Sequence, residues 1–317
     1  MVNEAHLLRP AASRRHLLPW AALISVWFLW GSTYLGIRAA VETIPPFMMA
    51  GARYGLAGAI MFAALAPQHA RGENRLTWPQ VRSSILVGAL LLVGGNGLLS
   101  LSEKKLHSGL AALIVATVPA WMVLMHAAVT KSRIPRPLLA ALVIGTAGVA
   151  VLVGGPGSAI DVGAAAIVLV ASVFWAAGSV SARMVTLPKH PLVATSLQML
   201  SGGVLLLILA AARGEFGAFH LADVSTRSAV AMVWLTVLGS MVAFSAYVYA
   251  IRTLPNDVVA TYAYVNPIVA VALGTVVDNE PISRNLLIGG AIIIGSVVLI
   301  VTDRAKRNAA EQRQARA

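Results

Sequence analysis

The stretch at residues 256–279 has the sequence NDVVATYAYVNPIVAVALGTVVDN. Its polar ends enclose an apolar run long enough to cross the hydrocarbon core of a bilayer, which takes about 20 helical residues. Two tyrosines, an asparagine and a proline nevertheless lie near its middle, where lipid cannot satisfy a carbonyl that proline leaves without a partner. The stretch therefore predicts a membrane helix that is interrupted beside a cavity or another helix.

The composition extends this interpretation to the whole chain of 317 residues. Hydrophobic residues make up 58% of it and charged residues 11%, against roughly 25% charged in ordinary soluble domains. The net charge of +12 comes from basic residues in loops and tails, as in cytoplasmic membrane loops, so it does not indicate a nucleic-acid partner. The expected fold class is an all-α polytopic membrane protein whose partners are membrane lipid and a small-molecule substrate.

Enzyme motifs are missing from the sequence. It contains no HExxH, no Walker lysine after a glycine loop and no cysteine. The residues that metalloprotease, phosphoryl-transfer and thiol chemistry require are therefore absent from the sequence. The glycine-rich GGNG at 94–97 lies in mid-span without a following lysine, and is not a phosphate loop. We expect no catalytic residues, no cofactor and no metal site.

Charge clusters and Pro/Gly-rich turns separate ten apolar segments. The motif RPAASRRH at 9–16 resembles the start of a signal peptide, but no small-residue cleavage motif follows it, so we expect a retained first span. The predicted spans are 20–37, 47–66, 83–101, 107–130, 138–155, 163–182, 192–212, 229–251, 256–277 and 286–302. They leave a cytoplasmic tail at 1–19 and a basic cytoplasmic tail at 304–317.

The second half of the chain repeats the first at an offset of 145, which becomes 148 after one adjustment. Rare residue types carry this match because apolar letters coincide easily by chance. The matching pairs are Trp30 with Trp175, Arg38 with Arg183, Pro46 with Pro191, Gly58 with Gly203, Pro119 with Pro267, and Arg136 with Arg284. We infer two five-span repeats, residues 20–157 and 158–303.

Five spans per repeat is an odd number, so the second repeat must enter the membrane upside down. Inverted repeats of this kind belong mainly to transporters, with a binding site at the midplane between the halves. With the amino terminus inside, 17 Lys and Arg residues fall on the inner side and 6 on the outer side. This bias predicts that both termini are cytoplasmic.

Three motifs occur in a definite order along the chain. They are WGSTYLGIRAAVETIPPFMMAGARYGLAG at 30–58, GNG at 95–97 and TYAYVNPIVAVALGTVVDNEPIS at 261–283. In this order the sequence resembles the EamA family of the drug/metabolite transporter superfamily, and most of all its YedA-like inner-membrane exporters. The resemblance covers about residues 20–303 and implies a ten-helix carrier that exports small metabolites by alternating access. The first repeat has TKSRIP at 130–135 where the second keeps Glu280 and Pro281, so we assign that acidic position no symmetrical gating role.

Arg53 is the one clear charge inside a span. Burying arginine costs about 2.5–3.5 kcal/mol on insertion scales, so such a residue usually faces the bundle interior or a cavity, where its guanidinium suits a carboxylate. Alternatively, Arg53 lies near enough to the span's end to snorkel to the interface. The pattern GARYG at 51–55, around this residue, predicts close helix packing within the bundle. All twelve acidic residues fall in tails, loops or span edges, which disfavours cation/proton antiport of the small-multidrug type.

Aromatic and hydroxyl side chains recur at equivalent places in the first span of each repeat. Trp30, Thr33 and Tyr34 share a helical face, and Trp175 and Ser179 lie at the equivalent positions. Such side chains suit a partly apolar solute, although single aromatic residues also form interface belts or fill packing gaps.

Asn96 lies deep in the third span, between two glycines. It is a further candidate for the substrate site. An asparagine inside a membrane also commonly bonds one helix to another, with an energy of about 1 kcal/mol, and that role is the alternative.

Pro119 and Pro267 predict helix breaks at equivalent places in the two repeats. Tyr262 and Asn266 lie four apart on one face of span nine, and Tyr264 lies on another, so one set alone can line the midplane site directly. We favour Tyr262 and Asn266 and keep Tyr264 in reserve; a simple packing kink is the alternative.

These patterns predict an inner-membrane exporter of small metabolites, amino-acid-like or drug-like, that works by alternating access. The alternative is a membrane sensor or interaction protein that binds a ligand without moving it. The short loops leave no room for a signalling domain, which favours transport. The substrate, the driving force and the choice between monomer and homodimer stay open.

Overall fold

The structure is a computed structural model that describes residues 11–69, 75–134, 136–154 and 160–314. Regular secondary structure within these ranges is helical, which is how so apolar a chain satisfies its backbone hydrogen bonds in lipid. The elements are α1 (Ala11–Ala40), α2 (Pro46–Ala64), α3 (Ala66–His69), α4 (Trp78–Gly88), η2 (Ala89–Gly97), α5 (Leu98–Ser102), α6 (Ser108–Val115), α7 (Val118–Thr130), α8 (Arg136–Gly154), α9 (Val162–Ser181), α10 (Pro191–Ala212), α11 (Glu215–Ala218), η3 (Leu221–Asp223), α12 (Thr226–Trp234), η4 (Leu235–Val242), α13 (Ala243–Thr253), α14 (Asn256–Val259), α15 (Tyr262–Asp278) and α16 (Arg284–Gln314).

Within the described ranges, nine helical segments are long and apolar enough to cross a membrane, so the chain is a multi-pass membrane protein. They coincide with nine of the ten predicted spans to within about five residues at each end. The predicted span at 256–277 is instead formed by the short helix α14 followed by α15, an apolar helix of 17 residues. The count of ten spans stays a prediction.

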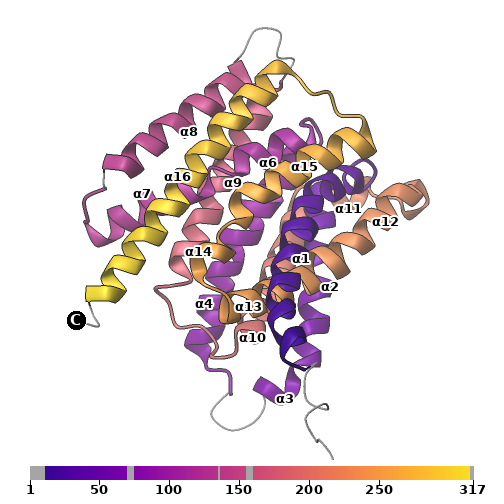
Figure 1. The fold of residues 1–317 in the computed structure, drawn as a ribbon. Coiled ribbons are helices and arrows are strands. Elements are labelled where there is room, and N and C mark those ends of the chain that lie inside the picture. The colour runs from indigo at the N-terminus through magenta and orange to yellow at the C-terminus, as the bar shows by residue number, and fades with distance from the viewer. Residues whose placement is uncertain (1–10, 70–74, 135, 155–159, 315–317) are drawn as a thin grey trace, which may run out of the picture.

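Both predicted tails are helical where they are described. The first helix begins at Ala11, and α16 continues to Gln314, well beyond the end of its apolar part at Asp303. The outermost parts of the tails, 1–10 and 315–317, lie outside the described residues. In Figure 1, α1 begins and α16 ends on the lower side of the bundle.

Two spans contain a π-helical stretch. These stretches, η2 and η4, begin at Ala89 and Leu235, which are 235 − 89 = 146 residues apart and so occupy equivalent places in the two predicted repeats. A π-helical turn rotates the side chains that follow it relative to a regular α-helix, and such turns are frequent at functional sites. The same departure from α-helical geometry thus occurs in spans three and eight.

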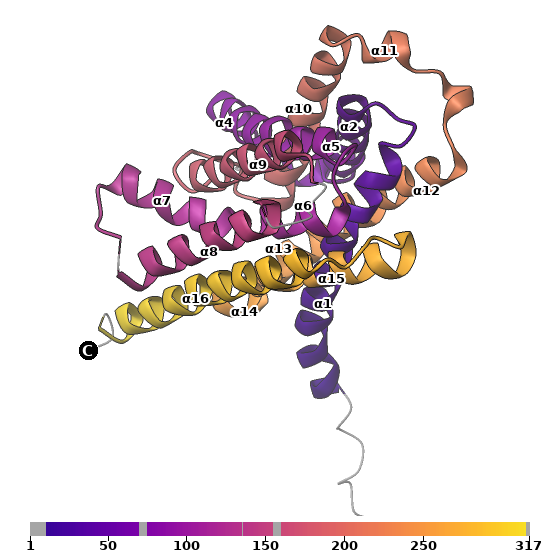
Figure 2. The ribbon, with the colours of Figure 1, turned by 90° about the horizontal axis from the view of Figure 1, so that it is seen from above.

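Glycines allow two helix pairs to approach closely. The helices α8 and α16 run side by side in both views of the molecule (Figures 1 and 2). The helices α2 and α10 meet at Gly203, where a Cβ atom would lie 2.6 Å from the Cα of Gly55. A Cβ on Gly51 would lie 2.9 Å from the backbone nitrogen of Leu207. The prediction that GARYG packs within the bundle is confirmed.

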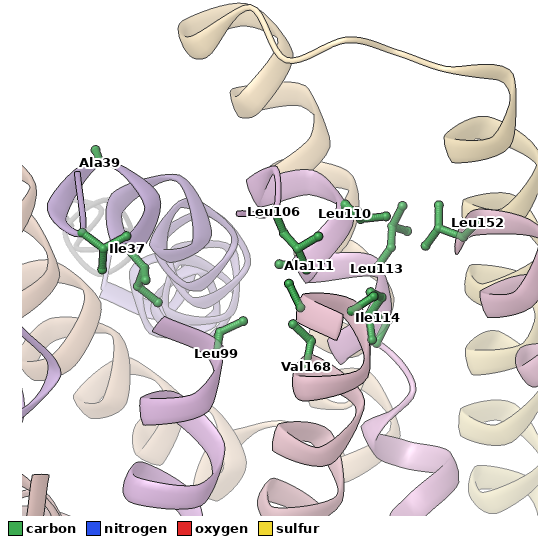
Figure 3. Packing of buried hydrophobic residues seen from close by; sticks show 14 of the residues in the cluster. Ile37, Ala39, Leu99, Leu106, Leu110, Ala111, Leu113, Ile114, Leu152 and Val168 are labelled. Atoms are coloured by element: carbon green, nitrogen blue, oxygen red, sulfur yellow. The ribbon is translucent and has the colours of Figure 1, made fainter. Parts of the chain in front are cut away.

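One end of the bundle is closed by apolar side chains. Figure 3 shows Ile37 of α1, Leu99 of α5, Leu110 of α6 and Val168 of α9 within this buried cluster. The connections next to it carry most of the acidic side chains outside the tails, and we call it the acidic end. The acidic residues in these connections are Glu42, Glu103, Asp161, Glu215, Asp223, Asp278 and Glu280.

Candidate substrate site

Arg53 faces the interior of the bundle. Its side chain projects from α2 toward η4, where Nε donates a hydrogen bond of 2.9 Å to Oγ of Ser240. The guanidinium carbon lies 4.6 Å from the ring centroid of Tyr54, and the residue is 3% exposed. The snorkelling alternative is therefore wrong, because the second turn of α2 presents position 53 to a neighbouring helix.

The backbone of η4 comes close to Arg53 because residue 239 is a glycine. A Cβ atom there would lie 3.2 Å from Nη2 of Arg53 and 2.9 Å from Cγ2 of Thr33. The hydroxyl of Thr33 donates to the carbonyl of Trp30 at 2.6 Å, so it is already satisfied within α1. Among the described residues, Nη1 and Nη2 of Arg53 have no hydrogen-bond acceptor. The site therefore presents free, positively charged donors.

An aromatic cluster lies beside this arginine and consists of Trp30, Phe244, Tyr247 and Tyr262. The ring of Trp30 lies 5.0 Å from those of Phe244 and Tyr247, and 5.4 Å from that of Tyr262, with centroids as reference points. The two tyrosine rings meet edge to face at 5.7 Å. Such geometries are favourable for aromatic pairs. Trp30 thus contacts rings inside the bundle, rather than lipid headgroups.

The aromatic cluster and Arg53 are neighbours along two helices. Trp30 and Thr33 lie three residues apart on α1, and Ser240 and Phe244 lie four residues apart across η4 and α13, so the members of each pair are about one helical turn apart. The sequence predicted Trp30, Thr33, Arg53 and Tyr262 as site residues, and the structure brings these four together. A guanidinium at one side and rings at the other suit a solute with a carboxylate and an apolar part.

Other predicted residues gather at a different contact, between α9 and η2. A Cβ on Gly95 would lie 2.9 Å from Cε3 of Trp175, and the hydroxyl of Ser179 donates to the Trp175 carbonyl at 2.8 Å. Asn96 is buried, and its side-chain nitrogen lies 3.5 Å from the carbonyl of Leu91. Among the described residues, the alternative role of Asn96 as a bond to another helix is not formed; its amide nitrogen instead makes a long contact within its own π-helical stretch.

Span nine places its polar residues on two sides. With its amide nitrogen turned toward acceptors, Asn266 donates to the carbonyls of Tyr262 at 3.3 Å and Trp27 at 3.2 Å. The indole nitrogen of Trp27 in turn donates to Oγ1 of Thr261 at 3.2 Å. Tyr264 instead packs against the apolar residues of the acidic end. Asn266 is thus engaged in joining α15 to α1, as the packing alternative requires.

The two prolines differ in their effect. The helix is interrupted between Val115 and Val118, so a new helix begins just before Pro119. In contrast, α15 continues through Pro267, and the expected break there is wrong. The interruption lies earlier, between Val259 and Tyr262. A helix that has just restarted loses a single backbone bond at proline, which membrane helices tolerate when neighbouring groups satisfy the freed carbonyl.

Hydrogen bonds and ion pairs hold the acidic end together around Arg38. Its Nη1 donates to the carbonyl of Leu106 at 2.6 Å, and its Nε lies 3.5 Å from Asp278 and 3.6 Å from Glu280. Glu280 also accepts from the backbone nitrogens that begin α6, at 2.7 Å from Ser108 and 3.1 Å from the next residue. We call these contacts the Arg38 network. Together with the buried apolar cluster, the Arg38 network closes the bundle on the side of the candidate site that faces the acidic end.

A cavity of about 180 Å³ opens elsewhere, between α7 and α9 at their ends away from the acidic end. None of the predicted site residues borders it, so we place the candidate site where the polar and aromatic side chains converge. The cavity is lined by Met122, His126, Val129, Thr130, Val180, Arg183 and Met184.

Sequence reasoning missed Ser240, Phe244 and Tyr247. These residues lie in span eight, whose orientation in the bundle is set by its π-helical stretch. One signal could have found the position: Gly239 and Ser240 match Gly94 and Gly95 at the repeat offset of 145. Small residues at equivalent places in the two predicted repeats are typical of a close approach of helices.

Comparisons with known proteins agree with this architecture. A model of the EamA-like transporter family matches residues 19–154 and again 163–302. The chain is 36% identical over 289 residues to "Uncharacterized inner membrane transporter YedA" of Escherichia coli (strain K12), covering 90% of this chain and 92% of that protein. It is 27% identical over 285 residues to "Uncharacterized transporter YvbV" of Bacillus subtilis (strain 168), covering 89% and 91%. One crystal structure matches at a TM-score of 0.59 over 91% of this chain and 97% of that chain; its 21% identity speaks for the fold alone.

Proposed function

This chain belongs to the EamA-like transporter family, and from that premise we propose that it exports small metabolites with a carboxylate and an apolar part across the inner membrane. Amino-acid-like compounds fit this description, as do drug-like acids. The exporter works by alternating access, in which the candidate site opens to one side of the membrane at a time.

The observation that carries the substrate class is the buried guanidinium of Arg53. A charge in a membrane span is costly and usually marks a substrate or ion pathway. Its Nε is held by Ser240, whereas Nη1 and Nη2 have no acceptor among the described residues. A planar pair of donors matches the two oxygens of a carboxylate. The aromatic cluster beside it supplies contact area for the rest of the solute.

Several features support ten spans in two inverted repeats, residues 20–157 and 158–303. The family model matches twice, and α15 with α14 supplies the short tenth span. Helix contacts also follow the predicted pairing of the halves. Thus α1 packs against α13 and α15, whereas the equivalent helix α9 packs against η2 and α7. Rocking of one repeat against the other would expose the site alternately.

The distribution of Lys and Arg supports a cytoplasmic position for both termini. The relative YedA is named as an inner membrane transporter, which supports the same membrane for this chain. In this orientation the acidic end faces outward. The Arg38 network and the apolar cluster then form the outer closure, which must open for export.

Flux measurement tests the proposal against a sensor that binds without translocation. An efflux screen on cells that overproduce the chain identifies the exported metabolite, and purified protein in liposomes is then loaded with it. We expect saturable exchange of the carboxylate compound, and far slower exchange of its neutral amide. Binding without flux above that of empty liposomes would support the sensor instead.

A further inference from the structure

Glu103 carries a buried carboxylate without a hydrogen bond to any described residue. It caps the end of α5, directly after the third span, and is 1% exposed. Within the part of the chain that the structure describes, neither Oε1 nor Oε2 has a hydrogen-bond partner. Most buried polar groups are paired, and an ionised carboxylate without partners is especially costly in a low-dielectric interior. A bound proton removes that cost, so the geometry favours the neutral carboxylic acid.

Charged groups surround Glu103 from several elements. The charged groups are Arg38 from α1, Arg53 from α2 and Glu280 from the connection between α15 and α16, and the neutral phenol of Tyr34 also comes from α1. The other helices that pack on α5, namely η2 and α9, contain no ionisable side chain. On its own connection, Lys104 and Lys105 are exposed and His107 is about half exposed; Lys105 pairs with Asp161, and His107 lies 3.9 Å from Glu280.

Neither of the two nearest cations forms a hydrogen bond or ion pair with the Glu103 carboxylate among the described residues. Arg38 donates to the backbone carbonyl of Glu103 at 3.3 Å, but its ion pairs are with Asp278 and Glu280. The Nε of Arg53 is held by Ser240. Burial and, after it, the negative charge of Glu280 raise the pKa of Glu103 well above its usual range, although Arg38 and Arg53 act in the opposite direction.

We propose that Glu103 is a proton-binding site which holds a proton while the acidic end is closed and releases it when that end opens. The proton becomes a second ligand of the transport cycle, so this inference rests on the proposed function and adds a coupling ion to it. The step is an ordinary ionisation, in which the carboxylic acid of Glu103 gives its proton to water that enters with opening.

The direction of the pH effect follows from linkage. An open acidic end lets water reach the carboxylate, and its pKa returns toward the ordinary value of about 4.3. Below that value both forms are protonated, and the closed form has the full advantage. As the pH rises through the raised pKa of the closed form, this advantage is lost. Opening of the acidic end is therefore favoured at high pH.

Infrared difference spectroscopy tests the protonation directly. Full-length protein in lipid nanodiscs, without substrate, is compared between about pH 6.5 and about pH 9, where ordinary carboxylates stay ionised. We expect a carbonyl-stretch band of a protonated carboxylic acid that disappears at the higher pH. Glu103→Gln should remove this band, whereas Glu42→Gln, a change at an exposed carboxylate of the same end, should keep it. A band that survives Glu103→Gln, or no such band in the native protein, overturns the proposal.

A distance measurement tests the coupling to opening. Because the chain has no cysteine, Lys104→Cys and Leu221→Cys can carry a pair of spin labels at exposed positions of the acidic end. We expect the population with the longer distance to grow as the pH rises, with a midpoint above about 4.3, and to stay constant in Glu103→Gln. The same pH response in both backgrounds overturns the coupling.

Two features keep these tests decisive. If Glu103→Gln does not fold, Glu103→Asp keeps a carboxyl group there, and we expect its band and its titration midpoint to shift; an unshifted band contradicts the assignment. Neither experiment uses a substrate, so failure of the proposed export activity would leave both results unchanged. If the protein transports its substrate but shows no pH response, the proposed export activity stands and the proton-binding role of Glu103 is refuted.

Discussion

The seam between α2 and α10 offers a quantitative test of the packing. Gly203→Ala places a methyl group against the backbone of Gly55, 2.6 Å from its Cα and 3.0 Å from the carbonyl oxygen of Gly51. These atoms belong to a helix backbone, so no side chain can rotate away. The two helices must separate along the seam that positions Arg53, which lies on the same stretch of α2.

The expected change in the free energy of unfolding follows from two opposing contributions. Overpacking of a tightly packed interior costs about 1–3 kcal/mol. Replacing glycine by alanine within a helix returns about 1 kcal/mol, because alanine restricts the unfolded chain and favours the helix. The expected net loss for Gly203→Ala is therefore up to about 2 kcal/mol, which should appear as a lower midpoint of thermal unfolding in detergent.

A matched control separates packing from helix propensity. Gly295 also lies in a membrane helix, but nothing lies within 4 Å of a Cβ atom built on it. We expect Gly295→Ala to unfold at the native temperature or slightly above it. If Gly203→Ala were as stable as Gly295→Ala, the close contact of α2 with α10 would be refuted.

Two further predictions concern topology and span nine. Single cysteines that replace Ser13 and Asn308 should react only from the cytoplasm, and one that replaces Ser158, outside the described residues, only from the outer side; reaction of Ser13→Cys and Ser158→Cys from the same side would contradict the odd-numbered repeat. Asn266→Ala should lower stability by about 1 kcal/mol, as loss of an interhelical bond does, and leave substrate affinity unchanged. Tyr262→Ala should weaken affinity about two- to tenfold, because a ring contact contributes about 0.5–1.5 kcal/mol. The opposite pattern, with affinity lost in Asn266→Ala alone, would return Asn266 to the site.

The sequence predicted most of the helix positions and part of the site, for identifiable reasons. Membrane spans can be recognised in a sequence because each helix needs about 20 apolar residues to cross the hydrocarbon core. Trp30 and Arg53 stand out because large polar side chains are rare inside spans. Their partners Phe244 and Tyr247 did not stand out, because the π-helical stretch that orients them has no distinct sequence pattern.

Burial at the ends of spans was harder to predict. Glu103 lies at a span edge, next to two lysines, where an acidic residue is normally hydrated. It is buried because distant segments, including the connection before α16, fold over it through the Arg38 network. Contacts between residues that lie so far apart along the chain leave no local periodic pattern in the sequence. For the same reason the sequence placed the break of span nine at Pro267, although the chain turns between Val259 and Tyr262.

The measurement that tests the central claim most directly is exchange of a carboxylate solute by Arg53 variants in proteoliposomes, with insertion verified for each. Arg53→Gln should lower exchange about ten- to a hundredfold, because a hydrogen bond to a charged group contributes about 1.5–3 kcal/mol. Arg53→Lys should retain part of the activity, because the charge remains while the paired donors are lost. Exchange at the native rate by correctly inserted Arg53→Gln would contradict the assignment of Arg53 as the group that binds the substrate.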